Sequence, residues 1–336
     1  MPRKARIDAV DAVQHIMARG IEGRIIFRND SDRYSFIERL AETLRDTTTD
    51  CLAWALMSNH FHLLLRTGSM PMEAVMRRLL TGYAVSFNLK YRRKGHLFQN
   101  RYKSILCQED IYLKELARYI HLNPLRKGIV ADLKALDKYP WTGHSAVMGY
   151  TSNEFQNIDY LLGFFGDKHR KCRLRYHQFV EKGVGSGYRS DLTGGGLVRS
   201  AGGWAEIKAL RRAGIKVRGD SRILGNGDFV ERVLADEDRF LQEKYDLQKA
   251  GFDFKTVIER AADIIKIDPQ EVMVPGKQPW RVRARDLVCF WSYRKLGMTT
   301  VDIARRLNMT QSAVTKASYR GERFVRKNRL KLTTKE

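Results

Sequence analysis

The sequence predicts an α+β fold, in which a small antiparallel sheet with flanking helices is followed by a mostly α-helical C-terminal domain. Over residues 1–150, short apolar runs of strand length alternate with segments whose apolar residues recur at helical spacing. A glycine-rich stretch follows at 183–203, which is typical of a flexible linker or an exposed loop. The alternative, a phosphate-binding loop, lacks the GKS/T motif and the strand-to-helix context. From residue 228 onward only helical periodicity is present. We therefore expect three parts, 1–150, a connecting segment 151–227, and 228–336.

The elements of residues 1–150 are expected in the order strand, helix, strand, strand, helix, strand, helix. The first helix begins with Ser31 and Asp32, which are favourable helix starts, and it carries apolar residues at helical spacing. Two apolar runs are separated only by Ser58–Asn59, which suits a hairpin turn. Pro124 is expected to end or cap the last helix. Strands are expected at 12–20, 51–57, 60–66 and 102–108, and helices at 31–46, 72–95 and 110–124.

The charge balance indicates a polyanionic partner. The 336-residue chain has a formal net charge of +23, and nucleic acid is the usual partner of so basic a protein. No apolar stretch reaches the length of a transmembrane helix, and no lysine-rich amphipathic helix suggests membrane binding. The four cysteines lie far apart without CxxC spacing, which argues against a zinc ribbon or a disulfide scaffold. A reduced, cytoplasmic location is therefore expected.

Two histidines lie in one of the expected strands. His60 and His62 are two residues apart, so both side chains project from one face of the strand, while Phe61 projects from the other. Two imidazoles placed in this way can chelate one divalent cation. The alternative is that they are packed or solvent-facing histidines without a ligand. His15 is expected on a neighbouring strand, in a structural role.

A tyrosine and an asparagine share one face of the last helix expected in the first domain. Tyr119 and Asn123 are four residues apart; a phenol can attack phosphorus, and a carboxamide oxygen can ligate a hard cation. His121 should point elsewhere, and either pack or face solvent. Tyr112, on the same helical face, is an alternative nucleophile. An ordinary core role for Tyr119 fits the spacing equally well.

Four stretches in collinear order resemble the single-tyrosine HUH transposases of the IS200 type, and most closely their REP-associated tyrosine transposase (RAYT) branch. They are "HIMARGIEGRIIFRNDSDRYSFIERL", "AWALMSNHFHLLLRT", "GHLFQNRYKSILCQEDIYLKELARYIHLNPLRKGIV" and "YPWTGHSAVMGY". Two later stretches, "GGGLVRSAGGW" and "DSRILGNGDFVERVL", resemble the middle segment of longer RAYT proteins. The resemblance implies an HUH domain with a ferredoxin-like or RRM-like antiparallel sheet, which agrees with the expected element order.

The resemblance also implies a role for each site residue. His60 and His62 match the metal-binding pair, Asn123 the polar third ligand, and Tyr119 the nucleophile. The implied cofactor is a divalent cation, Mg²⁺ or Mn²⁺, that neutralises charge at the scissile phosphate. The implied reaction is a nick that leaves a 5′-phosphotyrosine and a free 3′-OH, followed by rejoining. The implied substrates are hairpin-forming, REP-like palindromic sequences in single-stranded DNA.

A basic segment interleaved with aromatic residues precedes the tyrosine helix. The run "NLKYRRKGHLFQNRYKS" at 88–104 combines cations with aromatic rings, and this combination is typical of single-stranded DNA binding. The alternative is a solvated, basic helix end. The candidate contacts are Arg19 in the first strand and, in this run, Arg92, Arg93, Lys94, His96, Phe98, Arg101, Tyr102 and Lys103.

The C-terminal part contains a helix-turn-helix pattern. A short helix, "TVDIARRL", precedes a turn at Asn308–Met309, and Thr310 can cap a second helix. The stretch 281–322 resembles the DNA-binding domain of the bacterial replication initiator DnaA, which implies duplex DNA binding. A plain helical pair is the alternative. The candidate contacts are Gln311, Ser312, Thr315, Lys316 and Arg320.

These observations favour a metal-dependent enzyme that nicks and rejoins DNA. There are three alternatives: a domesticated, non-catalytic DNA-binding protein such as a repressor or architectural factor, a replication or conjugation initiator that shares HUH chemistry, and a ribonuclease or RNA-binding module. The complete set of His60, His62, Tyr119 and Asn123 argues against the first, and no helicase domain or second tyrosine motif supports the second. We expect a bacterial, cytoplasmic, nucleoid-associated monomer or homodimer without membrane contact.

Overall fold

The computed structural model describes residues 6–7, 11–68, 70–166, 169–186, 189, 192 and 219–333. The chain forms two compact units, Met1–Val233 and Leu234–Glu336, and each is described by itself. Most of the glycine-rich stretch expected to be a linker at 183–203 lies outside the described residues. None of the described helices is both long and apolar enough to cross a membrane.

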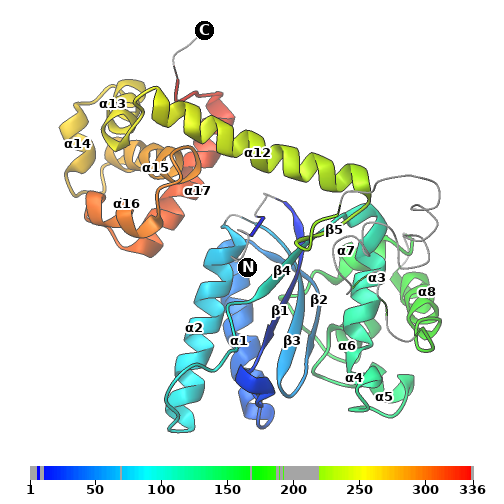
Figure 1. Cartoon of the computed structure of the whole chain (residues 1–336). Helices are drawn as coiled ribbons and strands as arrows, with labels where there is room; N and C mark the ends of the chain where they lie inside the picture. The colour runs from blue at the N-terminus through cyan, green and yellow to red at the C-terminus, as the bar shows by residue number, and fades with distance from the viewer. Residues whose placement is uncertain are drawn as a thin grey trace. The chain divides into compact units, whose positions relative to one another are not determined.

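The first unit is built on a five-stranded sheet (Figure 1). Its strands are β1 (Val13–Arg19), β2 (Asp50–Leu56), β3 (His60–Arg66), β4 (Lys103–Cys107) and β5 (Ile223–Leu224), in the spatial order β2-β3-β1-β4-β5. Neighbours among β1 to β4 pair antiparallel, and β5 adds to β4 in parallel. Together with α1 (Asp30–Thr47) and α2 (Met72–Lys90), β1 to β4 form the β-α-β-β-α-β arrangement of ferredoxin-like folds. The predicted α+β class is confirmed.

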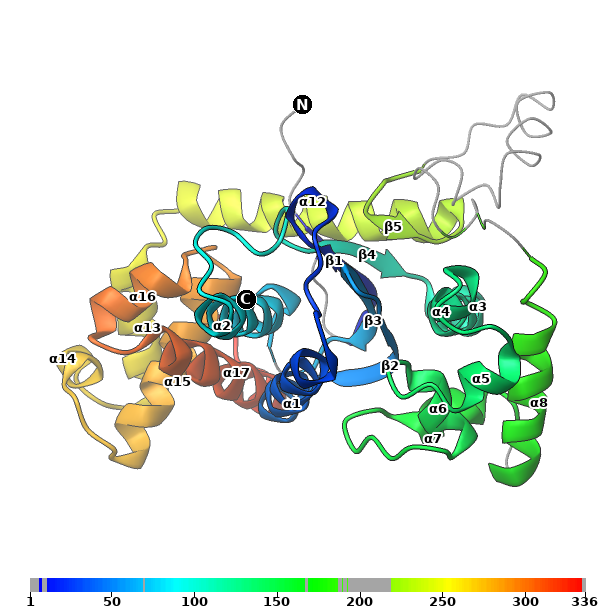
Figure 2. The ribbon, with the colours of Figure 1, turned by 90° about the horizontal axis from the view of Figure 1, so that it is seen from below.

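The sheet separates two apolar cores, because strand side chains alternate between its faces. Figures 1 and 2 show α1 and α2 on one face of the sheet and α3 (Glu109–His121) on the other. Phe61 is buried in the core on the side of α1 and α2, whereas Leu64 is buried in the core on the side of α3. His60 and His62 lie at even positions of β3, like Leu64, and therefore project toward the α3 side.

Two helices end earlier than the sequence predicts. α2 stops at Lys90, because the chain turns at Arg92, which has the left-handed conformation (φ 50°) that a right-handed helix cannot contain. α3 stops at His121, and a separate short helix, α4 (Asn123–Arg126), follows directly. Pro124 lies at the start of α4, where its missing N–H removes no helical hydrogen bond.

Further helices complete the face on which α3 lies. They are α5 (Leu133–Asp137), α6 (Gly143–Met148), α7 (Ile158–Gly163) and α8 (His169–Glu181). Leu161 of α7 and Tyr176 and Val180 of α8 are buried in the same core as the inner side of α3. The first compact unit thus includes helices from the stretch that sequence analysis assigned to the connecting segment.

The described part of the second unit is helical. Its helices are α12 (Gly227–Lys249), whose first turns belong to the first unit, α13 (Phe254–Ile265), α14 (Pro269–Met273), α15 (Pro279–Arg294), α16 (Thr300–Leu307) and α17 (Gln311–Asn328). Leu287, Ile303 and Val314 are fully buried between these helices. Where α15 and α17 cross, a Cβ on Gly321 would stand only 2.0 Å from the carbonyl oxygen of Asp286, so the crossing requires glycine.

Candidate active site

His60 and His62 lie on β3 and line an open pocket. Their ring centroids are 5.3 Å apart, and the ring planes are nearly perpendicular. The pocket has a volume of about 690 Å³. It is also lined by four cations, which are Arg19, Arg101, Lys103 and Lys127. The structure therefore brings both imidazoles to one face, as their spacing predicts, and surrounds them with positive charge.

His60 is held through its Nδ1 atom. This atom lies 2.7 Å from Oδ1 of Asn59, whose Nδ2 donates to the carbonyl oxygen of Gly23 at 2.9 Å. Because the Asn59 amide is oriented by Gly23, its oxygen accepts a hydrogen bond from Nδ1–H of His60. The Nε2 atom of His60 then carries the lone pair.

His62 has an equivalent partner on the neighbouring strand β1. Its Nδ1 lies 2.9 Å from Nε2 of His15, and both stacked side chains are buried. In the tautomer in which His62 donates to His15, the Nε2 atom of His62 carries the lone pair. Metal-binding histidines usually have such a partner on the other ring nitrogen, which fixes ring orientation and tautomer. Sequence analysis gave Asn59 only a turn role and His15 only a structural one.

The environment keeps both imidazoles neutral. Burial, reinforced by the charges of Arg19 and Lys127, lowers the pKa of His60 to about 4. Burial and the neighbouring His15 and His60 lower the pKa of His62 well below its usual range. Metal ions bind the neutral form of imidazole. Two neutral, oriented imidazoles on one strand face therefore fit a divalent cation.

Tyr119 faces the histidines from the last turn of α3. The centroid of its ring lies 6.1 Å from that of His62 and 6.3 Å from that of His15, edge-on to both. The guanidinium of Arg126, on α4, lies 5.3 Å from the Tyr119 ring centroid. The alternative nucleophile, Tyr112, lies in the first turn of α3 and packs against the core on that side of the sheet. The ring contacts with His62 and His15 thus single out Tyr119.

Asn123 closes the end of α3. It is buried, and its Nδ2 donates to the carbonyl oxygens of Tyr119 (3.1 Å) and Ile120 (3.3 Å). A ligand role would fall to its Oδ1 atom. Within the described part of the chain, no group of three or more His, Cys, Asp or Glu side chains could hold a metal ion. A cation on His60 and His62 would therefore take its other ligands from carboxamide, phosphate or water oxygens.

The predicted DNA contacts of the first unit divide between two pockets. Arg19, Arg101 and Lys103 line the histidine pocket, and His96, Phe98, Arg101 and Tyr102 line a second pocket of about 570 Å³ beside α2. Arg101 therefore belongs to both pockets. Tyr102 itself is buried, with the Arg6 guanidinium 4.2 Å from its ring centroid. Three predicted DNA contacts lie outside both pockets. Arg92 and Lys94 are exposed, and Arg93 is partly buried.

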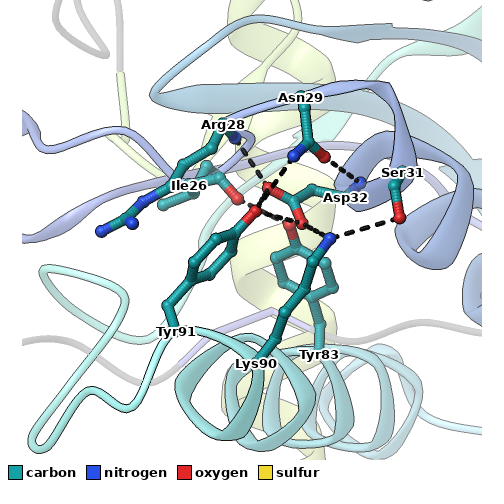
Figure 3. Close-up of polar contacts among 8 residues, drawn as sticks. All are labelled: Ile26, Arg28, Asn29, Ser31, Asp32, Tyr83, Lys90 and Tyr91. Carbon is teal, nitrogen blue, oxygen red and sulfur yellow. Dashed lines mark hydrogen bonds and ion pairs between the residues drawn. The ribbon is translucent and has the colours of Figure 1, made fainter.

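A buried carboxylate anchors the start of the basic segment (Figure 3). Asp32 of α1 accepts hydrogen bonds from Lys90 Nζ (2.6 Å), from the Tyr91 hydroxyl (2.8 Å) and from the backbone N–H of Arg28 (2.8 Å). Burial alone would raise the pKa of Asp32, but the hydrogen bonds from Lys90 and Tyr91 outweigh burial and lower it. The Arg28 guanidinium lies 4.2 Å from the Tyr91 ring centroid. Sequence analysis missed this anchor, because Asp32 has only the pattern of a helix start.

In the second unit, α16 and α17 occupy the positions expected for the helix-turn-helix pattern. Asn308 has a left-handed conformation (φ 50°) that ends α16. The Thr310 hydroxyl accepts a hydrogen bond from the N–H of Ala313 at 3.2 Å and so caps α17. The expected helix, turn and cap are therefore present.

The predicted contacts on α17 differ in their surroundings. Lys316 is exposed, whereas Thr315 is buried in the helical core. Arg320 is held by the carboxylate of Asp286 on α15, at 2.7 and 2.8 Å. The side chains of Gln311 and Ser312 lie outside the described part of the structure. Of the described predicted contacts on this helix, only Lys316 is both exposed and outside a strong ion pair.

Comparison with known proteins concerns the first unit. The family model described as "Transposase IS200 like" matches residues 9–123, a range that includes His60, His62, Tyr119 and Asn123. No curated protein gives a significant match. Among solved structures, that of a REP-associated tyrosine transposase bound to a REP hairpin is similar over 47% of this chain and 90% of that chain, with 16% sequence identity and a TM-score of 0.35. Residues 9–123 of the chain thus form a domain of the IS200-like transposase family.

Proposed function

We propose that the protein is a metal-dependent transposase, a single-strand DNA endonuclease that nicks and rejoins hairpin-forming DNA through a covalent bond to Tyr119. One observation supports this most strongly. The Tyr119 ring lies edge-on to His62, which is one of the two neutral histidines that line the cation-rich pocket, and all three residues lie in the segment that matches the IS200-like transposase family. A nucleophile next to a site for a phosphate is what such a reaction requires. The choice of REP-like palindromic DNA rests on the sequence resemblance to the RAYT branch.

The reaction uses the two histidines of the pocket together with Tyr119, in the last turn of α3, and Asn123, at the start of α4. His60 and His62, with Asn123 as a third ligand, would hold a Mg²⁺ or Mn²⁺ ion, which when bound neutralises charge at the scissile phosphate. The Tyr119 hydroxyl loses its proton to solvent and attacks phosphorus, and a phosphotyrosine bond forms on the 5′ side of the nick. The bond to the 3′ oxygen breaks, and that oxygen takes up a proton. Attack of a 3′-OH on the phosphotyrosine reverses these steps and rejoins the strand.

Positive charge near the phenol assists this chemistry. The guanidinium of Arg126 lies over the Tyr119 ring and stabilises negative charge on the attacking oxygen. Arg19, Lys103 and Lys127 would bind phosphates of the DNA backbone on either side of the scissile bond. These contacts read no sequence, so we expect them to supply affinity and register rather than choice of target.

The second unit would add duplex binding. Its helix-turn-helix pattern resembles the DNA-binding domain of DnaA, and exposed cations lie on both helices of the pattern, namely Arg305, Arg306, Lys316 and Arg323. A helix of this kind places its N-terminal residues against base edges in the major groove. We therefore assign duplex recognition to α17, with Lys316 as a phosphate contact.

The test is formation of a covalent protein–DNA adduct. A labelled single-stranded oligonucleotide with the palindrome that flanks the gene is incubated with the full chain and Mg²⁺ or Mn²⁺, then resolved on a denaturing gel. We expect a metal-dependent adduct that is lost in Tyr119→Phe and His60→Ala and kept in the matched control Tyr112→Phe. An adduct kept in Tyr119→Phe would contradict the proposed nucleophile. Tight hairpin binding without any adduct would instead indicate a non-catalytic DNA-binding protein.

A further inference from the structure

A chain of buried polar side chains meets the last turn of α3. The His121 Nδ1 atom lies 2.6 Å from the hydroxyl of Tyr176, and the same hydroxyl lies 2.9 Å from Nδ1 of His144. The Nε2 atom of His144 lies 2.8 Å from Oδ1 of Asp137. His121, Tyr176 and His144 are fully or almost fully buried. Four polar groups are thus joined end to end inside an otherwise apolar core.

The hydrogen bonds of this chain have one consistent direction. The Asp137 carboxylate accepts from Nε2–H of His144, so the His144 Nδ1 atom carries the lone pair and accepts from the Tyr176 hydroxyl. The Tyr176 oxygen in turn accepts from Nδ1–H of His121. His177 supports the start of the chain, with its Nε2 atom 3.3 Å from the other Asp137 oxygen. The carboxylate therefore fixes the tautomer of both histidines in the chain.

The environment favours these protonation states. Burial alone would raise the pKa of Asp137, but the hydrogen bonds and charges of His144 and His177 lower it, which keeps the carboxylate ionised. Burial raises the pKa of Tyr176 well above its usual range and lowers that of His121 well below it. At neutral pH the polar chain therefore consists of the Asp137 carboxylate, the Tyr176 phenol and the neutral imidazoles of His144 and His121.

This series of hydrogen-bonded side chains ends at His121, two residues from Tyr119. Residues two apart on an α-helix are rotated by about 200° about the helix axis, so His121 projects away from the side on which Tyr119 contacts His62 and His15. Both residues lie in the last turn of α3, so a hydrogen bond that fixes where the His121 side chain projects also fixes where the Tyr119 side chain projects. The apolar contacts of α3, such as those of Leu116 and Ile120, are buried but have no directional preference. The directional hydrogen bonds of the polar chain therefore set the rotation of the last turn of α3, which non-directional apolar contacts do not.

The partners of His121 come from outside the matched family segment. Asp137 ends α5, His144 lies in α6, and Tyr176 lies in α8, all beyond residue 123, where the family match ends. We propose that Tyr176, His144 and Asp137 are positioning residues, which act through His121 to hold Tyr119 in the direction of attack at the histidine pocket. This inference rests on the proposed function, because it takes Tyr119 as the nucleophile. Asp137 and His144 lie in the expected first domain, whereas Tyr176 lies in the segment expected to be a connection, which thus contributes to the active site.

A buried polar chain could also serve stability alone, so the test needs a matched loss of stability elsewhere. Tyr176→Phe removes the hydroxyl that joins the two histidines. Tyr83→Phe removes a comparable buried hydroxyl, which donates to the carbonyl oxygen of Ile26 at 2.6 Å on the other side of the sheet. For both variants we would measure the melting temperature, the affinity for the hairpin oligonucleotide, and the single-turnover rate of adduct formation at saturating oligonucleotide.

We expect both variants to melt at lower temperature and to bind the hairpin within twofold of wild type. Only Tyr176→Phe should slow adduct formation, by about tenfold, because a misdirected nucleophile lowers the rate at saturation without changing DNA affinity. Asp137→Asn keeps an acceptor for His144 and should restore most of the rate that Asp137→Ala loses. A rate in Tyr176→Phe no lower than in Tyr83→Phe would overturn the proposal.

Amide hydrogen exchange of α3 tests the same inference without DNA. Tyr176→Phe should speed exchange in the last turn of α3 by about tenfold, while Tyr83→Phe leaves it unchanged. Unchanged exchange in Tyr176→Phe would overturn the positioning role even if the enzyme is active. If wild type forms no adduct, the proposed function fails, and the exchange result still decides whether the polar chain holds α3.

Discussion

Each histidine of the pair has a partner at its Nδ1 atom. Asn59 lies 2.7 Å from Nδ1 of His60, and His15 lies 2.9 Å from Nδ1 of His62. The sequence contains a signal for Asn59, which directly precedes His60, but its second contact, with Gly23, depends on the fold. His15 and His62 are 47 positions apart and meet only because β1 and β3 are neighbours in the sheet. Sequence spacing can therefore identify His60 and His62. The residues that orient them can be identified only once the strand register is known.

The orienting role of Asn59 predicts a loss of metal affinity. Asn59→Ala should weaken Mn²⁺ binding about 10- to 100-fold, because His60 loses the acceptor that fixes its tautomer. Isothermal titration of the DNA-free protein with Mn²⁺ measures this. Asn328→Ala, at an exposed position of the second unit, is the matched control and should bind as wild type does. Wild-type affinity in Asn59→Ala would show that His60 does not depend on this amide.

The Asp32 anchor predicts a pH-dependent loss of stability. Asp32→Asn should lower the free energy of unfolding at about pH 7 by about 1–3 kcal/mol, since the buried carboxylate accepts hydrogen bonds from Lys90 and Tyr91. The folded-state pKa of Asp32 lies below its usual 3.8, so the unfolded chain takes up the proton first. The stabilisation is therefore complete above about pH 4 and is lost as the pH falls through the folded-state pKa.

Urea unfolding of wild type and Asp32→Asn at about pH 7 and about pH 3 tests this sign. The difference between the two proteins should be smaller at the lower pH. A difference that stays constant, or grows as the pH falls, would mean that the Asp32 carboxylate is not the stabilising form.

At the scale of elements, periodicity predicted β1 to β4 and helices α1 to α3, because each has an apolar pattern of its own. β5 could not be predicted in this way, since a strand of two residues shows no periodicity, and Ile223 and Leu224 are defined as a strand by pairing with Leu106 and Cys107 of β4. The end of α2 depends on the backbone of Arg92, a residue with no usual preference for left-handed conformation. Short and boundary features are therefore decided by tertiary contacts.

The crossing of α15 and α17 predicts a strict requirement for glycine. Gly321→Ala should destabilise the second unit by about 1–3 kcal/mol, because the new methyl group would collide with the carbonyl oxygen of Asp286. Gly163→Ala, where a Cβ meets no atom within 4 Å, is the matched control. Thermal unfolding followed by circular dichroism compares the two. Equal stability of both variants would contradict the close approach of these helices.

At the scale of the whole molecule, the charge of +23 is shared by two units with different candidate targets. Arg19→Ala combined with Lys127→Ala should weaken binding to the single-stranded hairpin and reduce the slope of log affinity against log salt by about 0.7 for each phosphate that is no longer neutralised. Affinity for duplex DNA should be unchanged. Lys316→Ala should instead weaken binding to duplex DNA and leave affinity for the hairpin unchanged. Fluorescence anisotropy with both DNAs over a range of salt concentrations measures these affinities. Equal effects of each variant on both DNAs would show that the two activities are not separate.

The site was predictable where chemistry follows from local spacing. His60 and His62 share a face because they are two residues apart in a strand, and the family resemblance selected Tyr119 over Tyr112. The polar chain behind α3 was not predictable. Its members come from four separate helices, and no local pattern brings His121 to Tyr176.

The attachment of DNA to Tyr119 is the step on which the rest of the mechanism depends. After reaction with the hairpin and Mn²⁺, nuclease and trypsin digestion places Tyr119 in peptide 119–126 and Tyr112 in peptide 104–114. Mass spectrometry of the digest should find nucleotide mass on peptide 119–126 and an unmodified peptide 104–114. Nucleotide mass on 104–114, or nicked DNA without any modified peptide, would contradict the mechanism.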